Sequence, residues 1–218
     1  MAPSPSPTRP VTREDILEAA ARIFRRKGYH AASMQDIARA VNLQKASLYH
    51  HVSSKQEILV ALLDRALDLL IEQMQGVLAM DAPPEEKLRQ AVLGYTRVLA
   101  ENRDLAAVLL LEFRFLEPEV RERHVRRRDA YERLWRQLLT EGQHAGVFHA
   151  EDPSLAAKAL LGMINWLVIW YRPSGPLTPQ EIGDYFGRVA LRSLVKPDCL
   201  SENETQPAGK NFPDNPQR

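Results

Sequence analysis

The sequence predicts an all-α fold of about nine helices, and three observations support this prediction. Apolar residues recur at every third or fourth position over most of the chain, which places them on one face of a helix. Proline and glycine interrupt this pattern, as at Pro83, Pro84 and Gly146. No alternating strand pattern and no internal repeat is evident. With 218 residues and 44% hydrophobic content, the chain can build a core in one large or two small domains.

The composition favours a cytoplasmic protein. Cys199 is the only cysteine, so an internal disulfide is excluded and a reducing compartment is expected. The N-terminus has no apolar segment of the kind that a secretory signal needs. The best uncharged apolar candidate for a membrane span, residues 159–171, is too short and is interrupted by Asn165. We therefore expect no membrane association.

Charge is distributed unevenly along the chain. Residues 1–55 carry nine Lys or Arg and four Asp or Glu, a net charge of +5, whereas the remainder has a net charge of −4. Three of the six histidines also lie in this first part. A basic head on an acidic body is typical of a DNA-binding module joined to a second module.

Capping residues predict where the first two helices begin. Thr12 is expected to cap the first helix, with Asp15 in its first turn favouring the helix dipole, and Gly28 is expected to end it. Ser33 is expected to cap the second helix, with Asp36 as a capping-box partner three residues later.

Residues 33–55 form the segment around which the rest of the chain is organised. They predict a short helix, a tight turn at Asn42 and a second short helix. Asn is the best choice after Gly for the left-handed conformation that such a turn needs. The outward face of the second helix carries hydrogen-bonding and cationic groups, namely Gln44, Lys45, Ser47 and His50. Such a face fits the major groove of DNA, where base edges offer donors and acceptors.

The run IARAVNLQKASLYHHVSSKQEIL resembles the DNA-binding signature of the TetR family of transcriptional regulators. The resemblance includes a helix entering at Thr12, the tyrosine at position 49 and Ser54-Lys55 opening the next helix. It departs from the family pattern at Asn42, where Gly is common, and at Val52, where Phe is common. A similar corner in an unrelated helical protein is the alternative.

The predicted DNA contacts follow from this motif. We expect Gln44, Lys45, Ala46, Ser47 and His50 to contact bases or phosphates, Tyr49 and Lys55 to hold phosphates, and Thr12, Ser33 and Gln35 to add backbone contacts. Tyr49 could also pack partly in the core. Adjacent His50 and His51 diverge on a helix and have no Cys or acidic partner, so no metal and no cofactor is expected.

Six further helices are expected in the body of the chain. The first is a long rod that could transmit a distant event to the DNA-binding head. Their expected ranges are residues 54–80, 85–101, 104–115, 118–145, a helix opening at Asp152-Pro153, and residues 178–195.

Two segments predict a homodimer with two-fold symmetry. Residues 155–171 are apolar almost all round, so this helix cannot have a solvated face. Gly183 and Gly187, four positions apart, would let another helix approach closely. Two such helices from each copy would form a four-helix interface. The expected interface residues are Leu161, Ile164, Val168, Ile182, Gly183, Phe186, Gly187 and Ala190. A monomer with a central buried helix is the alternative.

The family resemblance also implies a small-molecule pocket in the body. The candidate lining residues are Phe113, Phe115, Trp135, Phe148, Met163, Asn165, Trp166 and Trp170, with plain core packing as the alternative for each aromatic. The segment INWLVIWYRPSGPLTPQEI, with the basic residues 121–128 before it, is similar to the branch that senses fatty acyl-CoA. Arginines for phosphates would suit such a ligand, although a solvated basic face explains them equally.

These expectations combine into one function. The chain is interpreted as a flexible leader (1–10), a DNA-binding domain (11–54), a ligand-binding and dimerisation domain (55–195) and a disordered tail (196–218). It would act as a repressor that binds a palindromic operator as a dimer and is released by a small apolar ligand, for which the resemblance suggests an acyl-CoA. A helical scaffold without specific DNA binding is the alternative. An enzyme is disfavoured because no phosphate-binding loop, nucleophile elbow or metal-ligand spacing is present.

Overall fold

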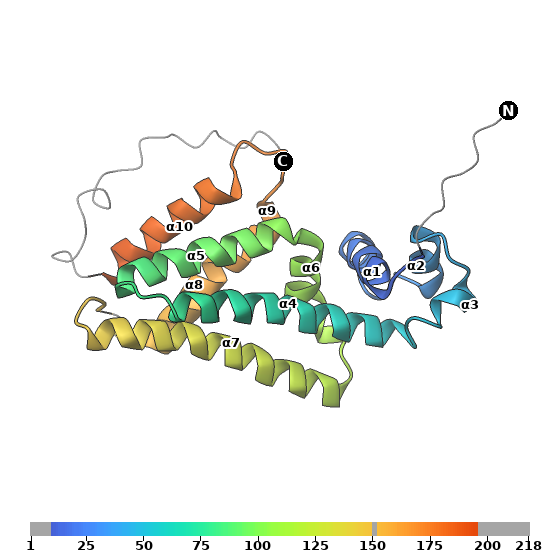
Figure 1. The fold of residues 1–218 in the computed structure, drawn as a ribbon, viewed down its shortest axis with the longest axis horizontal. Helices are drawn as coiled ribbons and strands as arrows, with labels where there is room; N and C mark the ends of the chain where they lie inside the picture. Colours follow the sequence, from blue (N-terminus) through green and yellow to red (C-terminus); the bar gives the residue numbers. More distant parts are fainter. Residues whose placement is uncertain (1–9, 150–151, 196–218) are drawn as a thin grey trace. The chain divides into compact units, whose positions relative to one another are not determined.

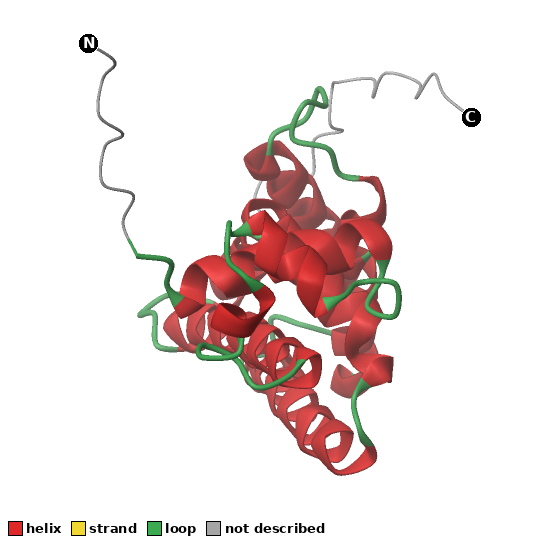
Figure 2. Ribbon diagram, turned by 90° about the vertical axis from the view of Figure 1, so that its right-hand side faces the viewer, coloured by secondary structure: helices red, strands yellow, loops and turns green. Residues whose placement is uncertain are grey.

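The computed structural model describes residues 10–149 and 152–195, and these residues form an all-α fold (Figure 1). The leader, apart from Pro10, and the tail expected at 196–218 lie outside the described residues. Figure 2 shows helices joined by loops, and within the described part the extended pairing is limited to an isolated bridge between Phe148 and Val195. The predicted fold class is therefore confirmed.

The first two of the three short N-terminal helices begin where their capping residues predict. Helix α1 spans Arg13–Lys27, α2 spans Met34–Ala40 and α3 spans Lys45–Leu48. The Thr12 hydroxyl accepts from the Asp15 backbone N–H at 3.2 Å, and the Asp15 carboxylate accepts from the Thr12 N–H at 2.8 Å. Ser33 and Asp36 repeat this capping box at α2. Gly28, with φ of 79°, ends α1 as expected.

The later helices agree with the sequence to within a few residues, with one division. Helix α4 spans Lys55–Leu78, α5 Pro84–Glu101, α7 Pro118–His144 and α10 Pro179–Leu194. The helix expected after Asp152 is divided at Trp166 into α8, Pro153–Asn165, and α9, Leu167–Trp170. Differences of one or two residues at helix ends have little meaning, because ends fray.

The helix expected over residues 104–115 changes type twice. Helix α6 covers Arg103–Ala107, a π-helix, η1, covers Val108–Glu112, and a 3-10 turn, η2, covers Phe113–Phe115. Apolar spacing alone cannot distinguish these from an α-helix, because the register changes only over single turns.

The described chain forms two compact units. The first contains residues 10–72, 98–133 and 165–171, and the second contains residues 73–97, 134–149, 152–164 and 172–195. Helices α1 to α3 thus share the first unit with part of α4 and with α6. Three short helices bury too little apolar surface to be stable alone, so they depend on these neighbours.

Within the second unit, helix α10 packs on α5 of the same chain through its glycines. A Cβ placed on Gly183 would lie 2.6 Å from Leu93 Cδ1 and 3.2 Å from Leu93 Cα. Gly183 therefore faces α5 of its own chain, and side chains that are buried within one chain have little surface to offer a second copy. The buried members of the predicted set are Ile164, Ile182, Gly183, Gly187 and Ala190, whereas Leu161, Val168 and Phe186 are half-buried.

Gly183→Val should therefore destabilise the fold. The added side chain must displace Leu93 and its backbone, and overpacking of this kind costs about 1–3 kcal/mol of unfolding free energy. Urea denaturation would measure it. Gly76→Val is the matched control, because a Cβ on Gly76 in α4 meets nothing within 4 Å. Equal stability of the two variants would show that α10 does not pack on α5 in this way.

The segment Pro153–Trp170 exposes apolar side chains. Only 22% of its 18 residues are buried, and Leu155, Trp166 and Ile169 are 66%, 62% and 53% exposed. By length and composition alone it could cross a membrane. Lys158 carries a charge, so the uncharged part of this segment begins at residue 159 and is as short as the sequence predicts. Exposed apolar surface on this scale marks an interaction site.

Candidate DNA-binding surface

The turn between α2 and α3 is built as the sequence predicts. Asn42 has φ of 57°, in the left-handed region, and it is the sole non-glycine residue with positive φ in the described ranges. The Leu43 N–H donates to the Ala38 carbonyl at 2.9 Å and closes the corner. Ile37 and Leu48, both fully buried, fix α2 and α3 to the core. The buried side of the motif therefore holds its outer side in place.

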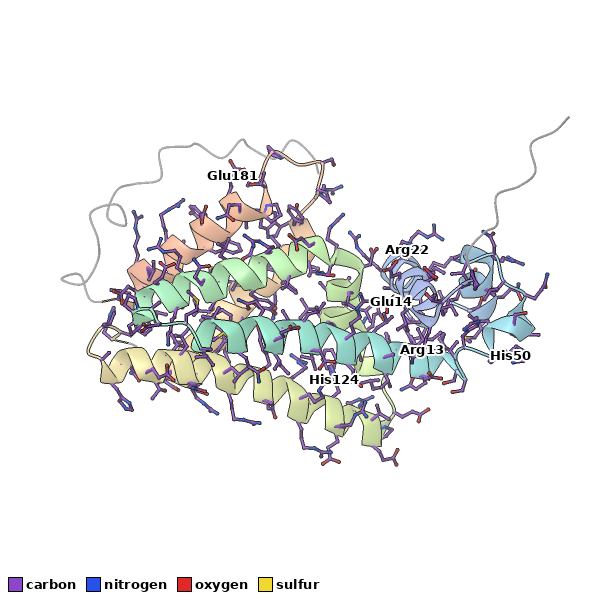
Figure 3. All side chains as sticks on the ribbon, in the orientation of Figure 1. Arg13, Glu14, Arg22, His50, His124 and Glu181 are labelled. Carbon is purple, nitrogen blue, oxygen red and sulfur yellow. The ribbon has the colours of Figure 1, made fainter. Side chains whose placement is uncertain are left out.

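The outer side of α3 presents the predicted contact residues to solvent. Gln44, Lys45, Ala46 and His50 are exposed, and Tyr49 is 46% exposed. Among the described residues, no side chain bonds to those of Gln44, Lys45 or His50, so their donors and acceptors remain available. Figure 3 labels His50 at this end of the motif. Ser47 is half-buried. A cationic group among neutral hydrogen-bonding groups is the chemistry that reads base edges and phosphates.

The hydroxyls of Thr12 and Ser33 are used within the protein. Each donates to the carboxylate three residues later, at 2.7 Å in both cases. Hydrogen bonds from Lys27 and Ser33 hold the pKa of Asp36 well below its usual range, so this carboxylate stays ionised. These residues fix the helix N-termini, and Gln35 is half-buried in the first turn of α2. The backbone N–H groups of Thr12 and Ser33 also donate to these carboxylates. The predicted DNA contacts of Thr12, Ser33 and Gln35 stay a prediction.

Lys55 is bonded to backbone carbonyls of its own chain. Its ammonium donates to the carbonyls of Tyr29 and Ala32, at 2.8 Å each, and lies 4.3 Å from the centre of the Tyr29 ring. Burial lowers the pKa of Lys55. Lys55 therefore helps to position the loop between α1 and α2, and its predicted contact with a phosphate stays a prediction.

Residues of η1 and η2 that the sequence did not identify also contact the loop between α1 and α2. The Glu112 carboxylate, 8% exposed, accepts from the Tyr29 backbone N–H at 3.2 Å. Phe115 stacks on Tyr29 at 5.7 Å and meets His30 edge-on at 4.2 Å between ring centres. Phe115 therefore helps to hold the loop between α1 and α2, and its predicted place in a ligand pocket stays a prediction. The available signal was Glu112, an acidic residue on an otherwise apolar segment.

The other candidate pocket residues have varied surroundings. Trp135 is fully buried with its ring centre 6.1 Å from that of Tyr95, and Phe148 is buried against Gly142. Trp166 and Trp170 are exposed instead, which does not suit the lining of an enclosed pocket. Met163 and Asn165 are half-buried, and Phe113 stacks near His124.

Two cavities lie within the first unit, and none of the eight predicted pocket residues lines either. One, of about 180 Å³, lies between α1, α4 and the start of α6 and has mixed charge, with Arg22, Glu18 and Glu101 in its wall. The other holds about 10 Å³ and is apolar, with Leu69, Leu105 and Leu109 in its wall. The second is too small for a drug-sized ligand, whose sites are usually about 300–1,000 Å³.

The basic residues of α7 are largely engaged with α4. Arg123 and Arg127 donate to Asp64 at 2.8 and 2.6 Å, and Arg127 also bonds to Asp68. Arg126 pairs with Glu122 along the same helix at 2.5 Å. The basic face is therefore more than a solvated surface, because part of it fastens α7 to α4. It also leaves fewer arginines free for a ligand than the sequence suggested.

Comparison with known families gives two matches that together cover most of the chain. Residues 16–62 match the model described as bacterial regulatory proteins, tetR family. Residues 81–194, more than half of the chain, match the tetracyclin repressor-like C-terminal domain. The first match contains the whole of α2 and α3, and the second contains α5 to α10.

Individual relatives agree with these matches. The regulator PfmR from Thermus thermophilus is 38% identical, with 83% of this chain and 99% of that chain covered and a TM-score of 0.77. AibR, solved in complex with isovaleryl coenzyme A and operator DNA, is 31% identical over 81% of this chain and 96% of its own, with a TM-score of 0.75. The transcriptional repressor KstR2 of Mycobacterium tuberculosis is 28% identical over 84% of this chain and 93% of its own length.

Proposed function

Since the chain belongs to the TetR family of transcriptional regulators, we propose that it is a cytoplasmic repressor released from DNA by a small molecule. It binds a palindromic operator as a homodimer, each copy contributing one α3 helix. The observation that carries the proposal is the solvent-facing set on α3, anchored by buried Leu48.

The proposed contact residues fall into a base-binding and a phosphate-binding group according to their side-chain chemistry. Gln44 and His50 can hydrogen-bond to base edges, and Lys45 and Tyr49 suit phosphate oxygens. Ala46 and Ser47 allow close approach of the helix because their side chains are small. Lys55 is left out of this set, since its ammonium is bonded to two carbonyls.

The dimer is proposed to form through the exposed apolar side of Pro153–Trp170. Leu155, Trp166, Ile169 and Trp170 are each at least 40% exposed in the single chain. Burying such side chains against their copies stabilises a two-fold dimer by the hydrophobic effect. This interface replaces the glycines and buried residues of α10 that the sequence suggested.

The effector is proposed to be an acyl-CoA or another small apolar molecule. Support comes from AibR, which was solved with isovaleryl coenzyme A, because it covers most of this chain at 31% identity. The ligand seen in a relative defines a class to test first and does not identify the molecule for this chain.

DNA binding is tested by fluorescence anisotropy with a duplex taken from upstream of the protein's own gene. Lys45→Ala is expected to weaken binding by about 1–3 kcal/mol and to reduce the slope of log K against log salt by about 1. Tyr49→Ala is expected to weaken binding with little change in that slope, because it removes a neutral hydrogen bond.

Arg172→Ala is the matched control, since it removes one exposed positive charge outside the DNA-binding head. It should leave affinity unchanged. If all three variants bound like the wild type, α3 would not be the reading helix. Failure of the wild type to bind any duplex at low salt would reject the proposed function.

A further inference from the structure

His124 on α7 is buried without hydrogen-bond partners. The side chain is 2% exposed, and neither ring nitrogen has a partner among the described residues. Figure 3 labels His124 where α7 runs beside α4. Buried polar atoms in native proteins are nearly always hydrogen-bonded, because leaving them unpaired costs their full desolvation energy. Two such nitrogens on one residue therefore call for a binding role.

The surroundings of His124 are positively charged. The centre of the Phe113 ring lies 6.1 Å from the centre of the His124 ring, with 29° between the two ring planes. The Arg128 guanidinium carbon lies 4.7 Å from the centre of the same Phe113 ring. Arg123 and Arg127 lie on the same helix, but both are bonded to Asp64 of α4. Across the described ranges, Arg128 has the Phe113 ring as its contact and no carboxylate. A guanidinium without a counter-charge thus neighbours an imidazole without a hydrogen bond.

The charge state of His124 limits what it can bind. Burial and the nearby Arg128 lower its pKa to about 4, with Arg127 and Arg123 acting in the same direction and Asp64 opposing them. The imidazole is therefore neutral near pH 7 and has one N–H donor and one acceptor nitrogen. The positive charge of Arg128, which no carboxylate offsets in the described residues, disfavours a metal cation here and favours an anion. An oxygen anion can accept from the imidazole N–H and pair with a guanidinium.

We propose that His124 and Arg128, beside the Phe113 ring, form a binding site for an oxyanion of the effector, a carboxylate or a phosphate ester. The imidazole donates one hydrogen bond to the anion, and the Arg128 guanidinium leaves the face of Phe113 to pair with it. The inference rests on the proposed effector response and adds the chemistry of one end of that effector. It narrows the basic residues 121–128 to Arg128. In the described part of the chain, Arg121 donates to the backbone carbonyls of Arg114 and Leu116. Arg123, Arg126 and Arg127 pair with carboxylates.

Histidine NMR of the full chain tests the site in the absence of DNA. The probes are inorganic phosphate, dodecanoate, dodecyl phosphate and, as the uncharged comparison, dodecanol. An oxyanion at the site should raise the pKa of one imidazole from about 4 by at least roughly one unit. That signal is assigned to His124 by its loss in His124→Leu, and dodecanol should leave it unchanged.

The choice of probe distinguishes the sources of the anion. A response to dodecanoate alone indicates a carboxylate, a response to dodecyl phosphate alone indicates a phosphate ester, and a response to inorganic phosphate alone indicates free phosphate. Each of these supports an oxyanion site. No response to any of the three anions, or an equal response to dodecanol, would overturn the proposal.

Two variants test whether His124 and Arg128 bind the anion or only support the fold. Arg128→Gln and His124→Gln should each weaken binding of the responding anion by at least about tenfold while leaving operator affinity unchanged. Arg126→Gln is the matched control, because this arginine is 63% exposed and paired with Glu122. Unchanged anion binding in Arg128→Gln would overturn the proposed oxyanion site. Failure of the wild-type protein to bind operator DNA would instead reject the proposed repressor function and not the oxyanion site.

Discussion

Replacing Trp166 and Ile169 with Asp is expected to give a monomer that binds a two-half-site operator roughly 10²–10⁴-fold more weakly than the wild type. The two side chains are 62% and 53% exposed in the single chain, so the substitution should not disturb its core. Facing copies would instead bring four carboxylates together in an apolar contact, where desolvation and like charge both oppose association. Each monomer then binds the operator through a single DNA-binding head and loses the avidity of two linked heads.

Light scattering and operator titration measure the two halves of this prediction. Val125→Asp is the matched control, since Val125 on α7 is 40% exposed and lies outside Pro153–Trp170. The control should remain dimeric with normal affinity. A double Asp variant that kept the mass of a dimer would place the interface elsewhere on the chain.

Acidification is expected to remove up to about 3 kcal/mol of stability through His124 alone. Its pKa falls from 6.5 to about 4 on folding, chiefly because of burial. Between these two values the unfolded chain binds the proton and the folded chain does not, so protonation favours unfolding. The free energy of unfolding therefore falls as pH decreases from about 6.5 to about 4, and each unit of the shift is worth about 1.4 kcal/mol.

Urea denaturation at pH 7 and pH 4.5 measures this loss. Carboxylates with lowered pKa, such as Glu57, also lose stabilising charge in acid, so the comparison must be between variants. His124→Leu should lose less stability than the wild type over this interval, because it has no imidazole to protonate. His144→Leu, exposed at the end of the same helix, is the control and should behave like the wild type. Identical losses in all three proteins would contradict the buried neutral state of His124.

The elements with local signals were predictable. Thr12 and Ser33 each precede a carboxylate at the spacing of a capping box, and both boxes form. Asn42 adopts the left-handed turn that its position required. The outward-facing residues around α3 follow from the same logic, because buried Leu48 determines which neighbours face solvent. These features depend on residues at most a few positions apart.

Long-range partners were not predictable from the same patterns. Glycines four positions apart permit a close helix contact but do not name the helix, and Gly183 meets Leu93 of its own chain. Lys55 and Phe115 have the chemistry of phosphate and ligand contacts, yet both are engaged around Tyr29. The oligomeric state and the effector remain proposals that the experiments above address.

The sequence by itself determined the helical fold, the start of each capped helix and the family, since these reside in short-range spacing and in a local motif. Tertiary structure alone decided which apolar and charged side chains are already satisfied within one chain. Pro153–Trp170 exposes apolar side chains, the glycine side of α10 is buried, and, within the described residues, Arg128 and His124 lack the counter-charge and the hydrogen bonds that their neighbours have. The reason is physical, because burial and charge pairing depend on residues that meet only when distant segments pack together.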